Sequence, residues 1–177
     1  MMMDDMDATI RRAVPDDLDA VVQVGRLTWP ATYASIAGDE YVEMGLGKWW
    51  THEATRPLVD SGRTFVAERP GDDGAREIVG IASTGLLSKD LVLFRLYVLP
   101  EHHGRGIGSQ LLKAVLDDIA RGSHTRLWLS YLVGNESARR FYARHGFVEQ
   151  RREPGGHGIP DSVWVMLELP IDPEASP

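Results

Sequence analysis

The pattern of apolar and polar positions divides the chain into short segments that predict strands and helices. Strands are predicted at residues 8–14, 63–69, 77–87, 91–99, 126–132, 147–151 and 163–169. Residues 91–99 are almost continuously apolar, which indicates a strand covered on both faces. The turn at residues 71–74 is rich in Gly and Asp and separates two of these strands.

Helical spacing of apolar residues predicts helices between these strands. The first follows Pro15 and is expected to end at Pro30. A second helical region is expected over residues 39–59, with interruptions near Gly45, Gly47 and Pro57. Two further helices are predicted by the repeats Leu111, Leu112, Val115 and Ile119, closed by Gly122, and Ala138, Phe141 and Tyr142, closed by Gly146.

The order of these elements predicts one mixed α/β domain. It has six to seven strands flanked by about four helices, and its core covers residues 8–169 of the 177-residue chain. Residues 1–7 and 170–177 are expected to be flexible ends.

Composition and charge narrow the environment of this domain. The chain has no cysteine, which excludes disulfides and a thiol nucleophile and favours a reducing compartment, the cytoplasm. A net charge of −7 argues against nucleic-acid binding and favours cationic partners, although solubility alone also explains it. No apolar run is long enough to cross a membrane, so no membrane association is expected.

A glycine-rich turn follows the most apolar strand and precedes a helix. It contains His103, Gly104, Arg105, Gly106, Ile107, Gly108 and Ser109. A helix start exposes unpaired backbone N–H groups, and glycines let these groups approach an anion closely. The turn therefore predicts a pyrophosphate cradle, with a plain strand-to-helix connection as the alternative. It lacks the Lys of a P-loop, and Ser109 stands where a dinucleotide fingerprint has glycine.

Two motifs resemble the GNAT family of N-acetyltransferases. Residues 103–108 resemble the family's acetyl-CoA motif, Gln/Arg-x-x-Gly-x-Gly/Ala, with His103 at its first position. Residues 135–147 resemble its second motif, Asn-x-x-Ala-x-x-Phe/Leu-Tyr followed by Gly-Phe. The resemblance covers about residues 91–147 and implies a mostly antiparallel central sheet. It also implies acetyl-CoA as co-substrate and an amine of a small molecule or a protein N-terminus as acceptor.

The resemblance also implies roles for individual residues. The backbone of Leu96, Tyr97 and Val98 would bind the pantetheine arm and polarise the thioester carbonyl. Tyr142 would be the general acid that protonates the leaving thiolate, with core packing as the alternative. Asn135 would lie by the cofactor, and it is also a good helix N-cap.

The general base is not assigned by the motifs. Ser130 stands where family members commonly place a carboxylate, and Arg95 is the only charge inside the strand at 91–99. The proton would leave through water or through a loop residue, for which Glu40, His157 and Asp161 are candidates.

Aromatic residues near the first helices predict the acceptor wall. Trp29, Tyr33 and Tyr41 would pack on an amine or contact its cation, with core or dimer packing as the alternative. A homodimer is expected, since family members often pair. The histidines form no metal-ligand pattern, so no metal is expected.

Three functions remain open from the sequence. The first is an active acetyltransferase. The second is a non-catalytic CoA-binding or regulatory domain of the same fold, favoured by Ser130. The third is an unrelated nucleotide-binding protein.

Overall fold

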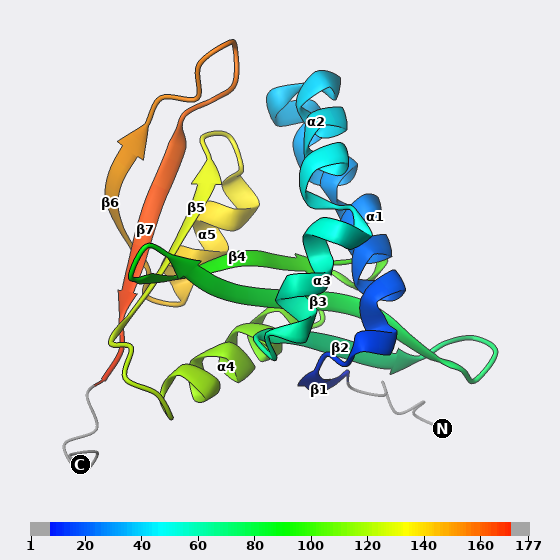
Figure 1. Ribbon diagram of the computed structural model, residues 1–177. Helices are drawn as coiled ribbons and strands as arrows, with labels where there is room; N and C mark the ends of the chain where they lie inside the picture. The colour runs from blue at the N-terminus through cyan, green and yellow to red at the C-terminus, as the bar shows by residue number, and fades with distance from the viewer. Residues whose placement is uncertain (1–7, 171–177) are drawn as a thin grey trace.

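A single seven-stranded sheet, seen in Figure 1, organises residues 8–170, the part of the chain that this computed structural model describes. Its strand order is β1-β2-β3-β4-β5-β7-β6, antiparallel throughout except for β4 and β5. The strands are β1 Thr9–Arg12, β2 Thr64–Pro70, β3 Arg76–Leu87, β4 Asp90–Val98, β5 Arg126–Leu132, β6 Val148–Glu153 and β7 Ser162–Glu168. The expectation of a mostly antiparallel sheet in an α/β fold is confirmed. The two expected flexible ends lie mainly outside the described residues.

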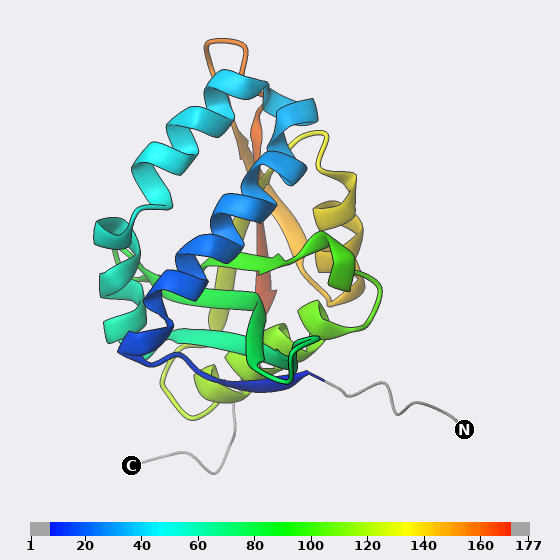
Figure 2. The ribbon, with the colours of Figure 1, turned by 90° about the vertical axis from the view of Figure 1, so that its right-hand side faces the viewer.

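Helices cover both faces of the sheet. They are α1 Leu18–Ala37, α2 Asp39–Trp49, α3 His52–Asp60, α4 Ile107–Ile119 and α5 Glu136–Arg144, with short 3₁₀ turns η1 Pro15–Asp17 and η2 Pro100–His102. Figures 1 and 2 show α1 to α3 on one face of β1–β4 and α4 on the other. Each face buries its own apolar cluster, and α5 packs with α4 in the same cluster. Within the described residues, no helix is both long and apolar enough to span a bilayer.

The first helix continues past Pro30 to Ala37, so the expected break there is wrong. A proline inside a helix costs one backbone hydrogen bond and about 3 kcal/mol. Trp29 and Tyr33, on either side of the proline, are 6% and 8% exposed. Burial of these two large rings offsets the cost of the proline, since each aromatic side chain buries extensive apolar surface.

The second helical region is divided at Trp50 and Thr51, not at the glycines or Pro57. Thr51 begins α3 as its N-cap, with its hydroxyl oxygen accepting from the Ala54 amide at 3.1 Å. Gly45 lies inside α2, where a Cβ would come within 2.4 Å of the Trp29 ring. Gly45 therefore allows α2 to pack closely on Trp29 of α1. The break at Trp50 and Thr51 raises the number of α-helices to five.

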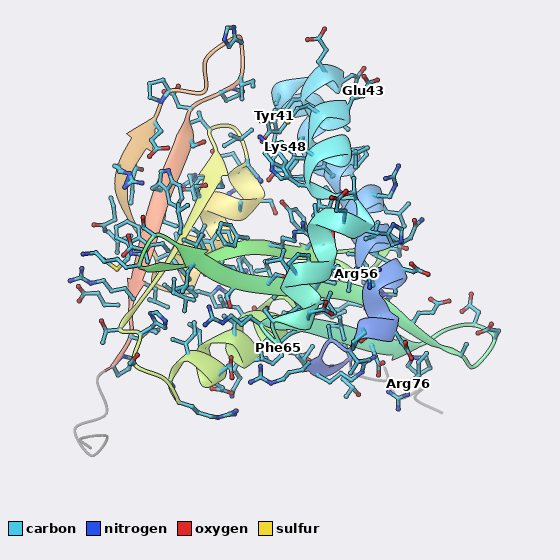
Figure 3. All side chains as sticks on the ribbon, viewed as in Figure 1. Tyr41, Glu43, Lys48, Arg56, Phe65 and Arg76 are labelled. Atoms are coloured by element: carbon cyan, nitrogen blue, oxygen red, sulfur yellow. The ribbon has the colours of Figure 1, made fainter. Side chains whose placement is uncertain are left out.

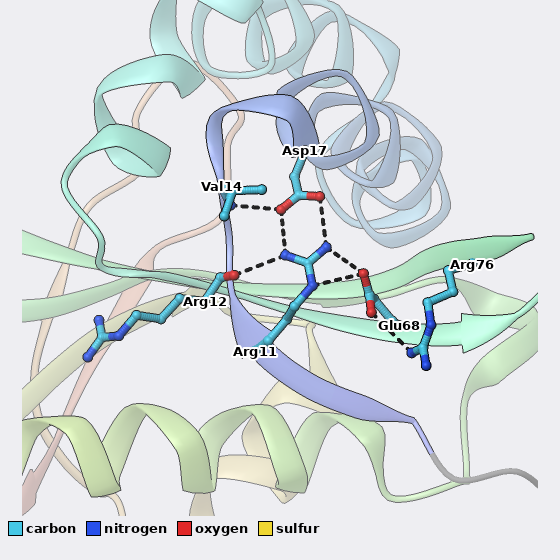
Figure 4. A network of polar contacts seen from close by, with 6 residues as sticks. All are labelled: Arg11, Arg12, Val14, Asp17, Glu68 and Arg76. Atoms are coloured by element: carbon cyan, nitrogen blue, oxygen red, sulfur yellow. Dashed lines mark hydrogen bonds and ion pairs between the residues drawn. The ribbon is translucent and has the colours of Figure 1, made fainter.

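A network of charged side chains fastens β1 and the start of α1 to the sheet (Figure 4). Arg11 donates to both carboxylate oxygens of Asp17, at 2.7 and 2.9 Å, and to Glu68 of β2 at 2.8 Å. Asp17 also accepts from the Val14 amide at 2.8 Å. The hydrogen bonds from Arg11 lower the pKa of Asp17, because they favour its charged form. The network holds the start of α1 in a fixed position relative to β1 and β2.

Candidate active site

The central feature of the site is a gap between the parallel strands β4 and β5. The two strands are in register at Val92 and Trp128, and no further pair joins them toward their carboxyl ends. A bulge in β4 leaves Phe94 unpaired, because Ser83 pairs with Arg95 and Thr84 with Leu93. Bulges bend a strand and increase its twist. The bend opens the sheet where the two strands diverge (Figure 1).

Backbone groups of β4 line this gap. The Leu99 amide donates to Val79 of β3 at 2.8 Å. Backbone polar groups alternate between the two edges of a strand, so those of Leu96 and Val98 point toward β5. Tyr97, between them, is bonded through its backbone toward β3 and contributes its side chain instead. Leu96 thus directs its backbone groups to the gap, and Val98 directs its amide there, since its carbonyl oxygen lies 2.7 Å from His103 Nε2.

The glycine-rich turn lies at the end of β4 and begins α4. Gly104 and Gly106 both have φ of +75°, and a Cβ on either would meet nothing within 4 Å. No side chain caps the N-terminus of α4, which leaves the first amides of the helix without a side-chain partner. Exposed amides beside an open backbone surface fit a phosphate group.

The side chain of His103 contacts the backbone of β4. Its Nε2 lies 2.7 Å from the carbonyl oxygen of Val98, across the turn. The side chain therefore joins the turn to the gap-facing edge of β4. A histidine at this position holds the turn against the strand, which the sequence pattern by itself did not indicate.

The second motif packs directly on the first. Asn135 caps α5, its side-chain oxygen accepting from the Ala138 amide at 3.2 Å. A Cβ on Gly108 would lie 3.3 Å from the Phe141 ring, so the start of α4 and the middle of α5 are in close contact. Gly108 thus serves helix packing, while Gly104 and Gly106 shape the exposed turn.

Tyrosine side chains from three distant elements lie near one another beside β4. Tyr33 of α1 and Tyr97 of β4 lie 3.3 Å apart, hydroxyl to hydroxyl. Burial and the proximity of Tyr33 raise the pKa of Tyr142 above its usual value, and burial and Tyr33 likewise raise the pKa of Tyr97. Tyr142 also stacks on Tyr131, with ring centroids 6.4 Å apart and an interplanar angle of 12°. All three phenols therefore stay protonated at neutral pH and act as hydrogen-bond donors.

Aromatic side chains enclose the α1 side of the gap. Trp29 lies at their centre, and its ring centroid is 4.3 to 6.3 Å from five others. We call this set the aromatic box: Trp29, Tyr33, Tyr41, Trp49, Trp50 and Tyr97. Tyr41, Trp49 and Tyr97 are partly buried, whereas the other three are buried. The predicted acceptor residues Trp29, Tyr33 and Tyr41 do come together, and the sequence analysis missed Trp49 and Trp50.

None of the candidate bases contacts the three hydroxyls. Ser130 is exposed and pairs with Trp164 of β7. Glu40 and His157 are exposed, and Asp161 accepts from the Gly155 amide within its own loop at 3.3 Å. No carboxylate contributes to the raised pKa of Tyr33 or Tyr142. Among residues 8–170, no group of three or more His, Cys, Asp or Glu side chains is arranged to hold a metal ion.

Comparison with known proteins places this geometry among acetyltransferases. The family model for the acetyltransferase (GNAT) domain matches residues 60–149, just over half of the chain. An uncharacterized N-acetyltransferase of Mycobacterium tuberculosis is 41% identical over 59 residues, which are 33% of this chain and 38% of that protein. The chain thus spans well under two thirds of that relative's length.

Also similar to this chain are a sequence and a solved structure from Thermoplasma acidophilum. Its spermidine N(1)-acetyltransferase is 28% identical over 108 residues, 60% of this chain and 67% of that protein. The crystal structure of its PaiA N-acetyltransferase in complex with coenzyme A superposes with a TM-score of 0.76 at 21% identity, covering 92% of this chain and 99% of that one.

Proposed function

This chain belongs to the GNAT family of acetyltransferases, and we propose that it transfers the acetyl group of acetyl-CoA to an amine by direct attack. One observation carries the proposal. The uncapped glycine turn that follows β4 begins α4, and the start of α4 packs through Gly108 on Phe141, the neighbour of Tyr142 in α5. Such an arrangement holds an elongated anionic thioester with its reactive end near a proton donor.

The residues present fit coenzyme A. The pyrophosphate would lie at the α4 N-terminus, on the amides that follow Gly104 and Gly106. The pantetheine arm would lie along β4 and hydrogen-bond to the backbone of Leu96 and Val98. Acetyl-CoA, when bound, supplies an acetyl group activated as a thioester. Asn135 positions α5 as its N-cap, and therefore also places Tyr142.

The proposed reaction needs one proton donor at sulfur and a neutral amine. The amine nitrogen attacks the thioester carbonyl carbon, so a C–N bond forms and the C–S bond breaks. The departing sulfur takes the hydroxyl proton of Tyr142, and the nitrogen releases a proton that restores the phenol through solvent. The raised pKa of Tyr142 keeps its proton available at neutral pH.

The substitution Tyr142→Phe tests this role. The ring keeps its contacts with Tyr131 and Phe147, and only the hydroxyl is lost. General acid catalysis is worth about 10²–10⁴ in rate, so we expect a loss of that order in kcat with little change in acetyl-CoA affinity or Tm. Tyr131→Phe is the matched control, since it removes a hydroxyl from the stacked neighbour. Near-full kcat in the Tyr142 variant, with chemistry rate-limiting, would remove Tyr142 from the mechanism.

A second candidate function is a CoA-binding domain without catalysis. Within residues 8–170 no carboxylate hydrogen-bonds to the hydroxyl of Tyr33 or Tyr142, which favours it. Thiol release from acetyl-CoA with a panel of amines distinguishes the two functions.

A homodimer located in the cytoplasm also stays a prediction. A monomeric mass by light scattering would contradict the dimer.

A further inference from the structure

The aromatic box includes the hydrogen-bonded hydroxyls of Tyr33 and Tyr97, and its partly buried side is where we place the acceptor amine. Tyr41 lies on the side of α2 that faces the β5 and α5 half of the molecule, whereas Glu43 lies on the opposite side of the helix (Figure 3). Tyr41 stacks on Trp29, with ring centroids 5.7 Å apart and an interplanar angle of 22°. The aromatic box therefore offers flat apolar surface and hydroxyl groups.

A buried cation lies directly behind the aromatic box. Arg95 is 7% exposed, and its guanidinium stacks on Trp50 with 4.1 Å between the guanidinium carbon and the ring centroid. It donates to the Thr55 hydroxyl at 3.0 Å and to the carbonyl oxygen of Trp49 at 2.5 Å. In residues 8–170 no carboxylate forms an ion pair with it. Burial lowers its pKa to about 10, so the group is still charged at neutral pH, and its charge interacts with Tyr97.

The remaining charges near the box do not offset this cation. Lys48 places its ammonium 5.3 Å from the centroid of the Trp49 ring, which adds a second positive charge at the exposed side. Asp39 and Glu40 are exposed in the first turn of α2. Burial and Tyr33, without any carboxylate, raise the pKa of Tyr41 to about 12.

An ammonium group at the partly buried side of the aromatic box would have no ion-pair partner. The aromatic faces pack against one another, and two of them already carry Lys48 and Arg95, so little cation–π attraction remains for a ligand. Two unit charges of like sign several ångströms apart at an effective dielectric of about 20 repel by an amount that changes affinity on the order of tenfold. A neutral amine carried on a flat apolar group needs no ion-pair partner and is not repelled by Arg95 or Lys48.

We propose that the acceptor is an amine that is uncharged at neutral pH and is carried on an aromatic group, and that Arg95 disfavours polyamines and other cationic acceptors. This inference rests on the proposed acetyltransferase function. It also accounts for the missing general base, because an amine that is already neutral needs no carboxylate to remove a proton before attack.

A three-amine comparison separates charge from aromatic character. 4-Methylaniline is aromatic and neutral at pH 7, benzylamine is aromatic and cationic, and spermidine is aliphatic and cationic. We expect kcat/KM, measured by thiol release from acetyl-CoA, to fall in that order by about tenfold or more overall. With benzylamine, kcat/KM should rise about tenfold per pH unit between pH 6 and pH 8, because only its neutral form reacts, while 4-methylaniline should give a flat profile.

Variants of Arg95, Lys48 and Tyr41 assign the selectivity to residues. Arg95→Met should raise kcat/KM for spermidine and benzylamine relative to 4-methylaniline by about tenfold, and Arg95→Lys should keep the wild-type ratio because it keeps the charge. Lys48→Met, at an exposed position, should shift the ratio in the same direction and remains informative where Arg95→Met does not fold. Tyr41→Leu should raise KM for 4-methylaniline about two- to tenfold, while Glu43→Gln, on the opposite side of α2, should not.

The outcomes distinguish this inference from the function on which it rests. Preference for spermidine, or an unchanged amine ratio in both the Arg95→Met and Lys48→Met variants, would overturn the inference and leave the acetyltransferase function standing. If the protein binds acetyl-CoA and acetylates only cationic amines, the inference is likewise overturned and the acetyltransferase function stands. Failure to bind coenzyme A by calorimetry would overturn both.

Discussion

The left-handed backbone at Gly106 permits a test that separates coenzyme A binding from folding. Gly106 and Gly62 have nearly the same φ, +75° and +72°, and a Cβ on either meets nothing within 4 Å. Gly106 precedes α4 in the glycine turn, whereas Gly62 follows α3 and precedes β2. The two Gly→Ala substitutions therefore impose matched backbone strain at a predicted binding position and at a distant one.

The expected cost in stability is the same for both. An L-residue in the left-handed region costs about 1–2 kcal/mol, and no steric clash adds to it at either position. For a domain of this size that cost lowers Tm by about 2–4 °C per kcal/mol. Gly62→Ala thus measures the strain without any contribution from the ligand site.

The expected cost in affinity differs between the two variants. In Gly106→Ala the methyl group occupies the open surface beside the first amides of α4, where the pyrophosphate would lie. Loss of one or two amide–phosphate hydrogen bonds, each worth about 1.5–3 kcal/mol, weakens binding about 10- to 100-fold or more. Gly62→Ala should bind coenzyme A with wild-type affinity.

Calorimetric titration with coenzyme A, together with thermal unfolding of each variant, gives both quantities. An unchanged Kd in Gly106→Ala with the matched drop in Tm would refute the phosphate cradle. A weakened Kd in Gly62→Ala as well would show that strain, and not the lost approach of the backbone, controls affinity.

Two further predictions concern the framework around the site. Arg11→Met should lower the free energy of unfolding by about 1.5–3 kcal/mol at pH 7. The folded pKa of Asp17 lies below its unfolded value, so this stabilisation is present above about pH 4 and is lost as pH falls through the folded pKa. Between about pH 5 and pH 3, denaturant unfolding should therefore show a smaller loss of unfolding free energy in the variant than in the wild type. Gly45→Ala should destabilise the protein because its Cβ would lie 2.4 Å from the Trp29 ring, whereas Gly47→Ala, in the same helix with nothing within 4 Å, should stabilise it by about 0.5–1 kcal/mol. Equal effects of these two glycine substitutions in chemical denaturation would contradict the packing of α1 on α2.

Several local features of the sequence predicted elements that the structure contains. The apolar run at 91–99 became the central strand β4, and the Asn135 cap and Gly146 bracket α5 at the expected positions. Such features are predictable because periodicity, caps and glycines act through neighbouring residues of the same segment. For the same reason the two motifs identified the family, since both lie on short continuous stretches of chain.

Tertiary contacts decided the features that local rules did not predict. α1 continues past Pro30 because burial of Trp29 and Tyr33 outweighs the lost hydrogen bond. α2 contains Gly45 because only a glycine admits the indole of Trp29 at that distance. In each case a residue that usually interrupts a helix lies inside one, because the helix packs against a distant segment.

The site itself divides in the same way. The sequence alone indicated the glycine turn and Tyr142, because each belongs to a motif with its own spacing. It did not indicate that Tyr33 and Tyr97, 64 residues apart, share a hydrogen bond at the gap where Tyr142 also lies. Nor did it indicate that Arg95 lies buried behind the aromatic box without a carboxylate in the described residues. Both arrangements depend on how α1 and α2 pack across the bulged end of β4, and the pattern of apolar residues in one segment carries no information about the placement of another.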